Sequence, residues 1–423
     1  MNPWRGLKNL PREMWILASV TFVNRAGTMV LPFLVLYLTR TLRISPAHAA
    51  LALTVYGVAA LLTMPVVGWL ADRVGALIVM KSSLLLSGVA LLLFPLAHRF
   101  GAILGMTFLF AVLNESVRPP SLALVSDLVT PAQRKSAFAL SRLAVNLGMS
   151  IGPAVGGILA ILSFRWLFFA DGITSILAAM VLILAWPEPR RLRSSEPQWD
   201  EPADLGREIE AEGPTTLLPA AHPLADLRAF RNPRMLYFLL AMIPVQLVFF
   251  QLTSTLPLFL VGGLRLPESF YGTIFTLNTL MIVALEVPLN GATSHWSHRR
   301  TLMLGAILYA VGFGAYAFVA RPAGVLSAVV VWTFGEMILM PGSSAYAAEI
   351  APPGRRGEYM GLYTMSFSIA FATGPWLGAQ ILQRWGGRTL WEIAFASGCI
   401  STALMSRIGS KPHSAPTAAE PAR

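Results

Sequence analysis

Runs of about twenty apolar residues recur along this chain, and they restrict its possible folds more than any other feature. An α-helix of that length crosses about 30 Å of hydrocarbon. Only 13% of the 423 residues are charged, whereas soluble domains are roughly 25% charged. These features predict a multi-pass membrane protein. Because lipid offers the backbone no hydrogen-bond partners, each span is expected to be a helix.

We predict twelve spans and therefore an all-α membrane protein. The spans cover residues 14–38, 47–71, 78–98, 101–125, 136–162, 165–186, 235–261, 268–292, 300–319, 323–348, 357–383 and 389–409. Residues 1–186 and 235–410 are expected to form two six-helix bundles. Residues 187–234, rich in charge, proline and Ser/Thr, predict a cytoplasmic linker, and residues 411–423 predict a disordered tail.

The distribution of basic residues predicts the orientation in the membrane. Of the 32 Lys and Arg residues, 21 fall on the side of the two termini, 8 on the other side and 3 within spans (Arg25, Arg118 and Arg142). Basic residues concentrate on the cytoplasmic side, so both termini are expected there. The bias also explains the net charge of +11 without nucleic acid. We expect the protein to lie in the inner (plasma) membrane of a bacterial cell as a monomer.

Several functional classes find no support in the sequence. Cys399 is the only cysteine, which excludes a disulfide within the chain and a cysteine-based metal site. The sequence has no HExxH zinc motif and no phosphate-binding loop. We therefore expect no enzyme activity, metal or cofactor. The basic N-terminus leads into a long apolar span without a small-residue cleavage site, which predicts an uncleaved first helix.

The two halves of the chain repeat each other. "RPPSLALVSDLVTPAQRKSAFALSRLAVNLGMSIGPAVGG" aligns with "MPGSSAYAAEIAPPGRRGEYMGLYTMSFSIAFATGPWLGA" without a gap at an offset of 222 residues. The offset pairs Pro119 with Pro341, Asp127 with Glu349, Pro131 with Pro353, Arg134 with Arg356, Pro153 with Pro375 and Gly156 with Gly378. Parallel repeats of this kind place a substrate site between the halves near the membrane midplane and let them rock around it.

Three motifs resemble the major facilitator superfamily of secondary transporters. "GWLADRVG" follows the second span, and "GMSIGPAVGG" lies in the fifth, where it resembles the drug:proton antiporter branch. Arg118 stands in the fourth span, where that branch usually has an arginine. The chain departs from the family at Ala76 and Leu77, which replace a basic pair, and at "GATSHWSHRR", which lacks the second Asp-Arg.

The resemblance implies a charged gate at the cytoplasmic side. Gly68 and Gly75 would permit a tight turn there, and Asp72 would lie against the start of the eleventh span. Arg73, Asp127 and Arg134 would complete the gate; alternatively, Asp72 only caps a helix.

The glycines of the fifth span have small-xxx-small spacing, which lets helix backbones approach closely. Pro153 adds a kink. Two roles remain open for this group, helix packing and sealing of the cavity against leak. The group comprises Gly148, Gly152, Pro153, Gly156 and Gly157.

Polar residues within spans are candidates for the substrate site, because their burial in lipid is costly. The family places the first, fourth, seventh and tenth helices around its cavity. On those helices lie Asn24, Arg25, Asn114, Glu115, Arg118, Gln246, Gln251 and Glu336. Glu115 and Arg118 stand three residues apart and are expected to share one helical face.

Proton coupling requires a group that gains and loses a proton. No histidine falls deep within a span, so a carboxylate is expected to serve. Removal from water favours the neutral form, and a nearby arginine favours the ionised form. We therefore favour Glu336 as the proton carrier and then Glu115. Alternatively, Glu115 forms a structural ion pair with Arg118, and Glu336 faces a polar neighbour.

Two further embedded acids stand outside this set. Asp171 is expected to be structural, pairing with Arg142 or lying near the lipid headgroups. The role of Glu286 is open.

The leading functional hypothesis is a proton-driven exporter of small amphipathic molecules. The alternative is a proton-coupled uptake symporter for an anionic solute such as a peptide or organic acid, with Arg25 and Arg118 as carboxylate clamps. The direction of transport distinguishes the two.

Overall fold

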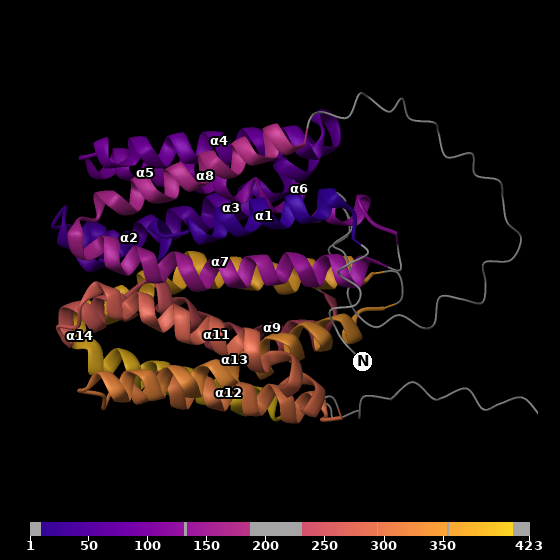
Figure 1. The fold of residues 1–423 in the computed structure, drawn as a ribbon. Helices are drawn as coiled ribbons and strands as arrows, with labels where there is room; N and C mark the ends of the chain where they lie inside the picture. Colours follow the sequence, from indigo (N-terminus) through magenta and orange to yellow (C-terminus); the bar gives the residue numbers. More distant parts are fainter. Residues whose placement is uncertain (1–9, 131–132, 187–230, 294, 353–354, 409–423) are drawn as a thin grey trace, which may run out of the picture.

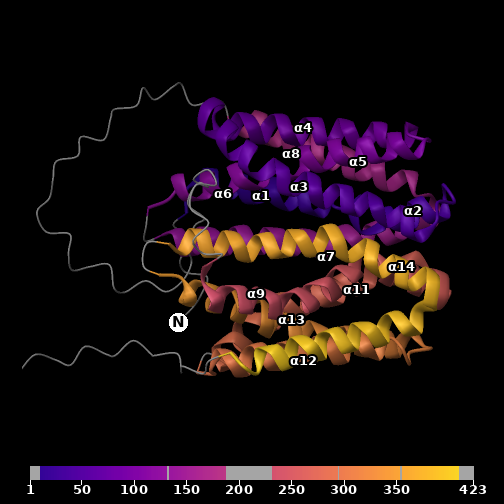
Figure 2. The same cartoon turned by 180° about the vertical axis from the view of Figure 1, so that it is seen from behind.

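The computed structural model describes residues 10–130, 133–186, 231–293, 295–352 and 355–408. All regular elements within these ranges are helices, and they run side by side as one elongated bundle (Figures 1 and 2). We use "linker end" for the end at which α8 finishes and α9 begins, and "opposite end" for the other. The predicted linker and tail fall mostly on residues outside the described ranges.

The first half of the chain contains eight α-helices. They are α1 (Arg12–Ala26), α2 (Val30–Arg40), α3 (Pro46–Val74), α4 (Ala76–Leu93), α5 (Phe100–Glu115), α6 (Arg118–Asp127), α7 (Arg134–Leu162) and α8 (Arg165–Ala185). A 3₁₀ turn, η2 (Phe94–Leu96), follows α4. The first predicted span corresponds to α1 and α2 together, and the fourth to α5 and α6.

The second half follows the same plan. Its elements are α9 (Pro233–Phe249), η5 (Phe250–Thr253), α10 (Thr255–Pro257), η6 (Leu258–Gly263), α11 (Glu268–Thr293), α12 (His298–Ala315), α13 (Pro322–Ile350) and α14 (Arg356–Met405). Helix α14 contains the last two spans, which meet at Gly386. The backbone there has φ +83°, a conformation that favours glycine.

The structure confirms the all-helical membrane fold. Within the described residues, nine helical segments are long and apolar enough to cross a membrane. The other three predicted spans correspond to α12 and the two parts of α14. Helix α12 begins with His298, Arg299 and Arg300, and α14 is rich in Gly, Ser and Thr, so these spans have a lower mean hydropathy.

Two adjacent prolines break the fourth span. Pro119 and Pro120 carry no N–H, so they cannot donate to the carbonyl groups of Glu115 and Ser116. Helix α5 therefore ends at Glu115, and α6 restarts at Arg118 with proline in its first turn. The expectation that Glu115 and Arg118 share one continuous helical face is not met.

Contacts within each half repeat at the 222-residue offset. A Cβ added to Gly152 would lie 3.0 Å from the carbonyl oxygen of Arg25, and one added to Gly374 would lie 3.3 Å from that of Leu247. Gly156 faces Met29 in the same way that Gly378 faces Gln251. Adding 222 to the residue numbers of each contact in the first half gives the matching contact in the second half. The repeat therefore extends from the aligned segment into the first helix of each half.

The two halves meet along two pairs of helices, α3 with α14 and α7 with α11. Gly57 packs against the backbone of Ala372, to which an added Cβ would come within 2.9 Å. On the other side, Thr276 Oγ1 donates a hydrogen bond to the carbonyl oxygen of Ser150 at 3.0 Å. The helices of one half therefore contact the other half without an intervening layer of lipid.

We expect Gly272→Ala to destabilise this interface. The added Cβ would collide with the carbonyl oxygen of Pro153 across the halves, so α11 must move away from α7. Overpacking of this kind costs about 1–3 kcal/mol in the free energy of unfolding. The measurement is thermal unfolding of purified protein in detergent. Gly105→Ala is the matched control, because a Cβ there meets no heavy atom within 4 Å in the described part of the chain. Equal melting temperatures for the two variants would contradict the prediction.

Candidate functional site

Glu115, Asn114 and Tyr56 form a hydrogen-bonded cluster in the first half. Tyr56 on α3 donates from Oη to Glu115 Oε1 at 2.7 Å, and Asn114 Nδ2 donates to Tyr56 Oη at 2.7 Å. The ring of Tyr56 contacts Phe371 of α14 edge-on, with ring centroids 5.8 Å apart. A hydrogen bond to the Glu115 carboxyl group is therefore made by a residue that also touches the other half.

Glu336 occupies a similar position in the second half. It lies on α13 and is partly buried. Asn278 on α11 donates from Nδ2 to Glu336 Oε2 at 2.8 Å and to Thr333 Oγ1 at 3.1 Å. Helix α11 is itself one of the interface helices. The carboxyl group is thus hydrogen-bonded to the helix that packs against the first half.

These two clusters are related by the internal repeat. Tyr56 and Asn278 are 222 residues apart, and so are Asn114 and Glu336. The bond between Asn114 and Tyr56 therefore has the bond between Glu336 and Asn278 as its counterpart. In each half the bond joins the fourth helix of the repeat to its second. One half uses a neutral amide where the other uses a carboxyl group that can bind a proton.

The arginines near the first cluster have no ionic partner among the described side chains. Arg118 is exposed and forms no ion pair with Glu115, because the proline break separates the two residues. Arg25 is partly buried and lies within Coulombic range of Tyr56 and Asp171. The N–H groups of Arg25 and Arg118 can therefore donate hydrogen bonds to a ligand.

The three other predicted cavity residues bond within their own halves. Asn24 is 7% exposed and donates to Ser175 Oγ at 3.4 Å. Gln246 is 1% exposed and donates to Ser366 Oγ at 3.0 Å. Gln251 bonds the carbonyl oxygen of Gly374 at 2.9 Å. Their contacts are those of helix packing around the breaks in the first and seventh spans.

Asp171 is buried and caps a helix break. Its Oδ2 accepts hydrogen bonds from the backbone N–H groups of Met29 at 3.1 Å and Val30 at 3.0 Å, where α2 begins. The first turn of a helix has N–H groups without intrahelical partners, and a carboxylate suits them. The possibility that Asp171 pairs with Arg142 is wrong, because Arg142 bonds Glu286 instead, at 3.0 Å.

The structure describes only part of the predicted gate. The side chains of Asp72, Asp127 and Arg134 lie outside what is described, so their roles stay predictions. Gly75 is the single residue between α3 and α4, and its φ of +99° favours glycine. A Cβ added at Gly68 would meet no heavy atom of the described residues within 4 Å. The Arg73 guanidinium lies over the ring of Trp69 on its own helix, 4.2 Å from the centroid.

The glycines of the fifth span face two different helices. Gly148, Gly152 and Gly156 lie against the end of α1 and the start of α2. Gly157 lies against α11, with an added Cβ 2.8 Å from Ser269 Cα. The carbonyl group of Pro153 also faces α11, at Gly272. This segment therefore packs within the first half and against the second half.

Tyr56 and Asn278 are not among the site residues that the sequence predicts. Both are polar groups inside apolar spans, which is the usual signal for such a site. Applying the 222-residue offset to the second span pairs them directly.

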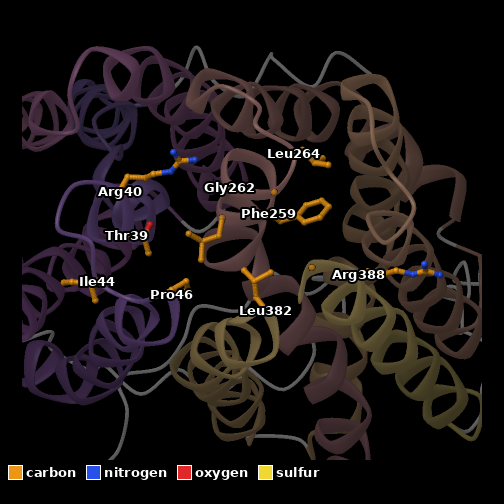
Figure 3. A pocket seen from close by; sticks show the side chains of 12 residues that line it. Thr39, Arg40, Ile44, Pro46, Phe259, Gly262, Leu264, Leu382 and Arg388 are labelled. Atoms are coloured by element: carbon orange, nitrogen blue, oxygen red, sulfur yellow. The ribbon is translucent and has the colours of Figure 1, made fainter. Parts of the chain in front are cut away.

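At the opposite end, an open cavity of about 570 Å³ lies between the halves. Figure 3 shows Thr39, Arg40 and Pro46 of the first half on one side, and Phe259, Gly262 and Leu382 of the second half on the other. Arg40 Nη2 donates to the carbonyl oxygen of Val261 at 2.8 Å. The backbone N–H of Ala47 donates to Gln383 Oε1 at 3.3 Å. These bonds join the halves at this end.

Known proteins share this sequence pattern. Residues 17–271 and 255–421 match the Major Facilitator Superfamily. The uncharacterized MFS-type transporter YqjV of Bacillus subtilis is 24% identical over 94% of this chain and 92% of its own length. A Na(+), Li(+), K(+)/H(+) antiporter of Planococcus maritimus is 23% identical over 84% of this chain and 85% of its own. The quinolone resistance protein NorA of Staphylococcus aureus is 26% identical over 45% of this chain and 49% of its own.

The fold agrees with this match. A solved structure of the peptide transporter POT superposes with a TM-score of 0.75 over 94% of this chain and 95% of that chain, at 15% identity. At that identity the likeness concerns the fold alone. Because the family match covers nearly the whole length, this chain belongs to the Major Facilitator Superfamily and is a membrane transporter of small molecules, not an enzyme.

Proposed function

We propose that the protein is a proton-coupled exporter of small amphipathic molecules that works by alternating access. The observation that carries the proposal is the hydrogen bond of the Glu336 carboxyl group to Asn278, on an interface helix. When Glu336 gains a proton, one of its oxygens becomes a donor, and the electrostatic attraction to the Asn278 N–H group weakens. Binding or release of the proton therefore alters a contact of α11, the helix that packs against α7 of the first half.

Glu115 is the second candidate for proton binding. It is bonded to Tyr56, which touches Phe371 of the other half. Asn114, Arg25 and Arg118 are proposed to contact the substrate. Asn114 belongs to this cluster, Arg25 lies within Coulombic range of Tyr56, and Arg118 begins the helix that follows the cluster in the chain. Sequence relatives that are described as a cation/H⁺ antiporter and a quinolone resistance protein support both the proton coupling and the export.

The proposed setting follows from the basic residues and the repeat. The linker end would face the cytoplasm of a bacterial cell, with both termini there, and the protein would work as a monomer in the inner membrane. Residues 1–186 and 235–410 would be the two moving units. The gating set of Gly68, Asp72, Arg73, Gly75, Asp127 and Arg134 would close the cytoplasmic side in the outward-open state.

An uptake symporter for an anionic solute is the second candidate. The specific observation in its favour is that Arg25 and Arg118 have no ionic partner among the described side chains. Two free guanidinium groups suit a carboxylate or phosphate group of a substrate.

A vesicle assay distinguishes the two functions. Inside-out vesicles that contain the wild-type protein, energised to be acidic inside, are given a panel of fluorescent amphipathic cations and radiolabelled organic acids and peptides. An exporter accumulates a dye and releases it when the pH gradient is collapsed. Accumulation of an anionic solute only in right-side-out vesicles would overturn the export proposal in favour of uptake. Transport of a substrate at a rate independent of the pH gradient would overturn proton coupling.

A further inference from the structure

One ion pair joins the two halves close to the candidate proton site. Arg142 lies on α7 in the first half, and Glu286 lies on α11 in the second. Arg142 Nη2 is 3.0 Å from Glu286 Oε1 and 3.2 Å from Oε2. The arginine side chain is 69% exposed, whereas the glutamate side chain is 15% exposed. The carboxylate is therefore the more buried partner, and the arginine of the other half is its counter-ion.

Helix α11 carries both this carboxylate and the amide that holds Glu336. Asn278 bonds Glu336 at 2.8 Å, and Glu286 lies on the same helix within Coulombic range of Glu336. From α12, Tyr309 also lies within Coulombic range, and its buried hydroxyl has no hydrogen-bond partner among the described residues. Tyr363 of α14 is near Tyr309 and bonds Ser343 Oγ at 2.6 Å. Glu286 is therefore the charged group within Coulombic range of Glu336, and Arg142 is the ionic partner of Glu286.

We propose that Arg142 and Glu286 form a charge pair across the halves that responds to the protonation state of Glu336. The inference rests on the proposed function, in which Glu336 carries the coupling proton. Both are positioning residues that act through Glu336, and neither is proposed to bind the proton or the substrate.

The physical basis is a change in the number of charges that Arg142 faces. With Glu336 ionised, the arginine faces two carboxylates of the second half. After Glu336 binds a proton, Arg142 faces only one carboxylate, that of Glu286. In a partly buried site this difference is screened less than in water. The attraction of Arg142 on α7 for the second half therefore weakens when the proton binds. The arrangement seen here, with the pair formed, is favoured by ionised Glu336.

The two partners have opposite effects on Glu336. Arg142→Gln removes a cation and leaves Glu286 as an unpaired negative charge, so Glu336 should ionise only at a higher pH. Glu286→Gln removes the negative charge and frees Arg142, so Glu336 should ionise at a lower pH. Each shift is expected to be about one pH unit, a tenfold change in proton concentration. A pair that only stabilised the fold would give no such opposite shifts.

The first measurement is an infrared pH titration of the full-length protein in lipid nanodiscs. The C=O stretch of a protonated carboxyl group that titrates in wild type and is absent in Glu336→Gln reports Glu336 directly. The variants are Arg142→Gln, Glu286→Gln and the double variant, whose midpoint should lie within a few tenths of a pH unit of wild type. Arg388→Gln and Glu392→Gln are matched controls. They break an exposed ion pair on α14 and should leave the midpoint unchanged.

The second measurement is the distance between spin labels at the linker end of the two halves. Labels at Ile78 of α4 and Ala403 of α14, in a Cys399→Ser background, report the separation without touching the pair. In the wild-type protein the distance between the labels should change with pH. The midpoint of this change should equal the midpoint of the infrared titration. Both single variants should lose at least half of this distance change.

The outcomes separate this inference from the proposed function. If no titrating carboxyl band is lost in Glu336→Gln, the proton-carrier role fails. If the band is lost but Arg142→Gln and Glu286→Gln shift its midpoint in the same direction, or not at all, the charge-pair inference fails while the proposed function stands. Retention of the full distance change in both single variants would also overturn the inference.

Discussion

Replacement of Glu336 by Gln is expected to abolish accumulation of substrate against its gradient while leaving exchange of substrate without a pH gradient intact. Gln has the shape of a protonated glutamate but cannot release a proton. It can still bond Asn278, so the contact between α13 and α11 is kept. The transporter should therefore continue to change conformation with substrate bound, but the pH gradient no longer drives the cycle.

The measurement uses proteoliposomes with an imposed pH gradient and the substrate found in the vesicle assay. Accumulation by Glu336→Gln should fall to the level of protein-free liposomes, whereas counterflow should stay within a few-fold of wild type. Glu392→Gln is the matched control, since it neutralises an exposed carboxylate of the same half. Gradient-driven accumulation by Glu336→Gln would remove this residue from the coupling step. Its loss in Glu115→Gln instead would assign the role to Glu115.

Asp171→Ala is expected to cause the largest loss of stability of any single substitution considered. The change removes the shared acceptor of the Met29 and Val30 N–H groups, at 3.1 and 3.0 Å, in a buried position. Each unsatisfied N–H group costs about 1–3 kcal/mol. The restart of the first span at α2 then has no side-chain cap. Thermal unfolding in detergent should show a marked fall in melting temperature.

Asp171→Asn separates capping from proton chemistry. The amide oxygen of Asn can occupy the position of Oδ2 and accept the same two bonds, although without the charge. We expect it to retain more than half of the stability lost in Asp171→Ala and to transport with a normal pH dependence. A stable Asp171→Asn protein without gradient-driven transport would show that Asp171 takes part in coupling.

The membrane fold followed from the sequence with little ambiguity. Apolar runs and the lack of hydrogen-bond partners in lipid leave helices as the solution, and each predicted span overlaps an observed helix. The 222-residue repeat, read from forty residues, also holds for contacts at the start of each half. Examples are Gly152 with Arg25 and Gly374 with Leu247. These features depend on local composition and on the spacing of residues, both of which can be read directly from the sequence.

The tertiary structure alone decided which polar groups meet. Glu115 and Arg118 are neighbours in sequence, yet the prolines end the helix between them, and Glu115 bonds Tyr56 instead. Arg142 pairs with Glu286, 144 residues away and in the other half. The sequence indicates only that a charge within a span needs a partner or access to water. Which partner is within 3 Å depends on how twelve helices pack, and this is set by the sum of many weak contacts along their whole length.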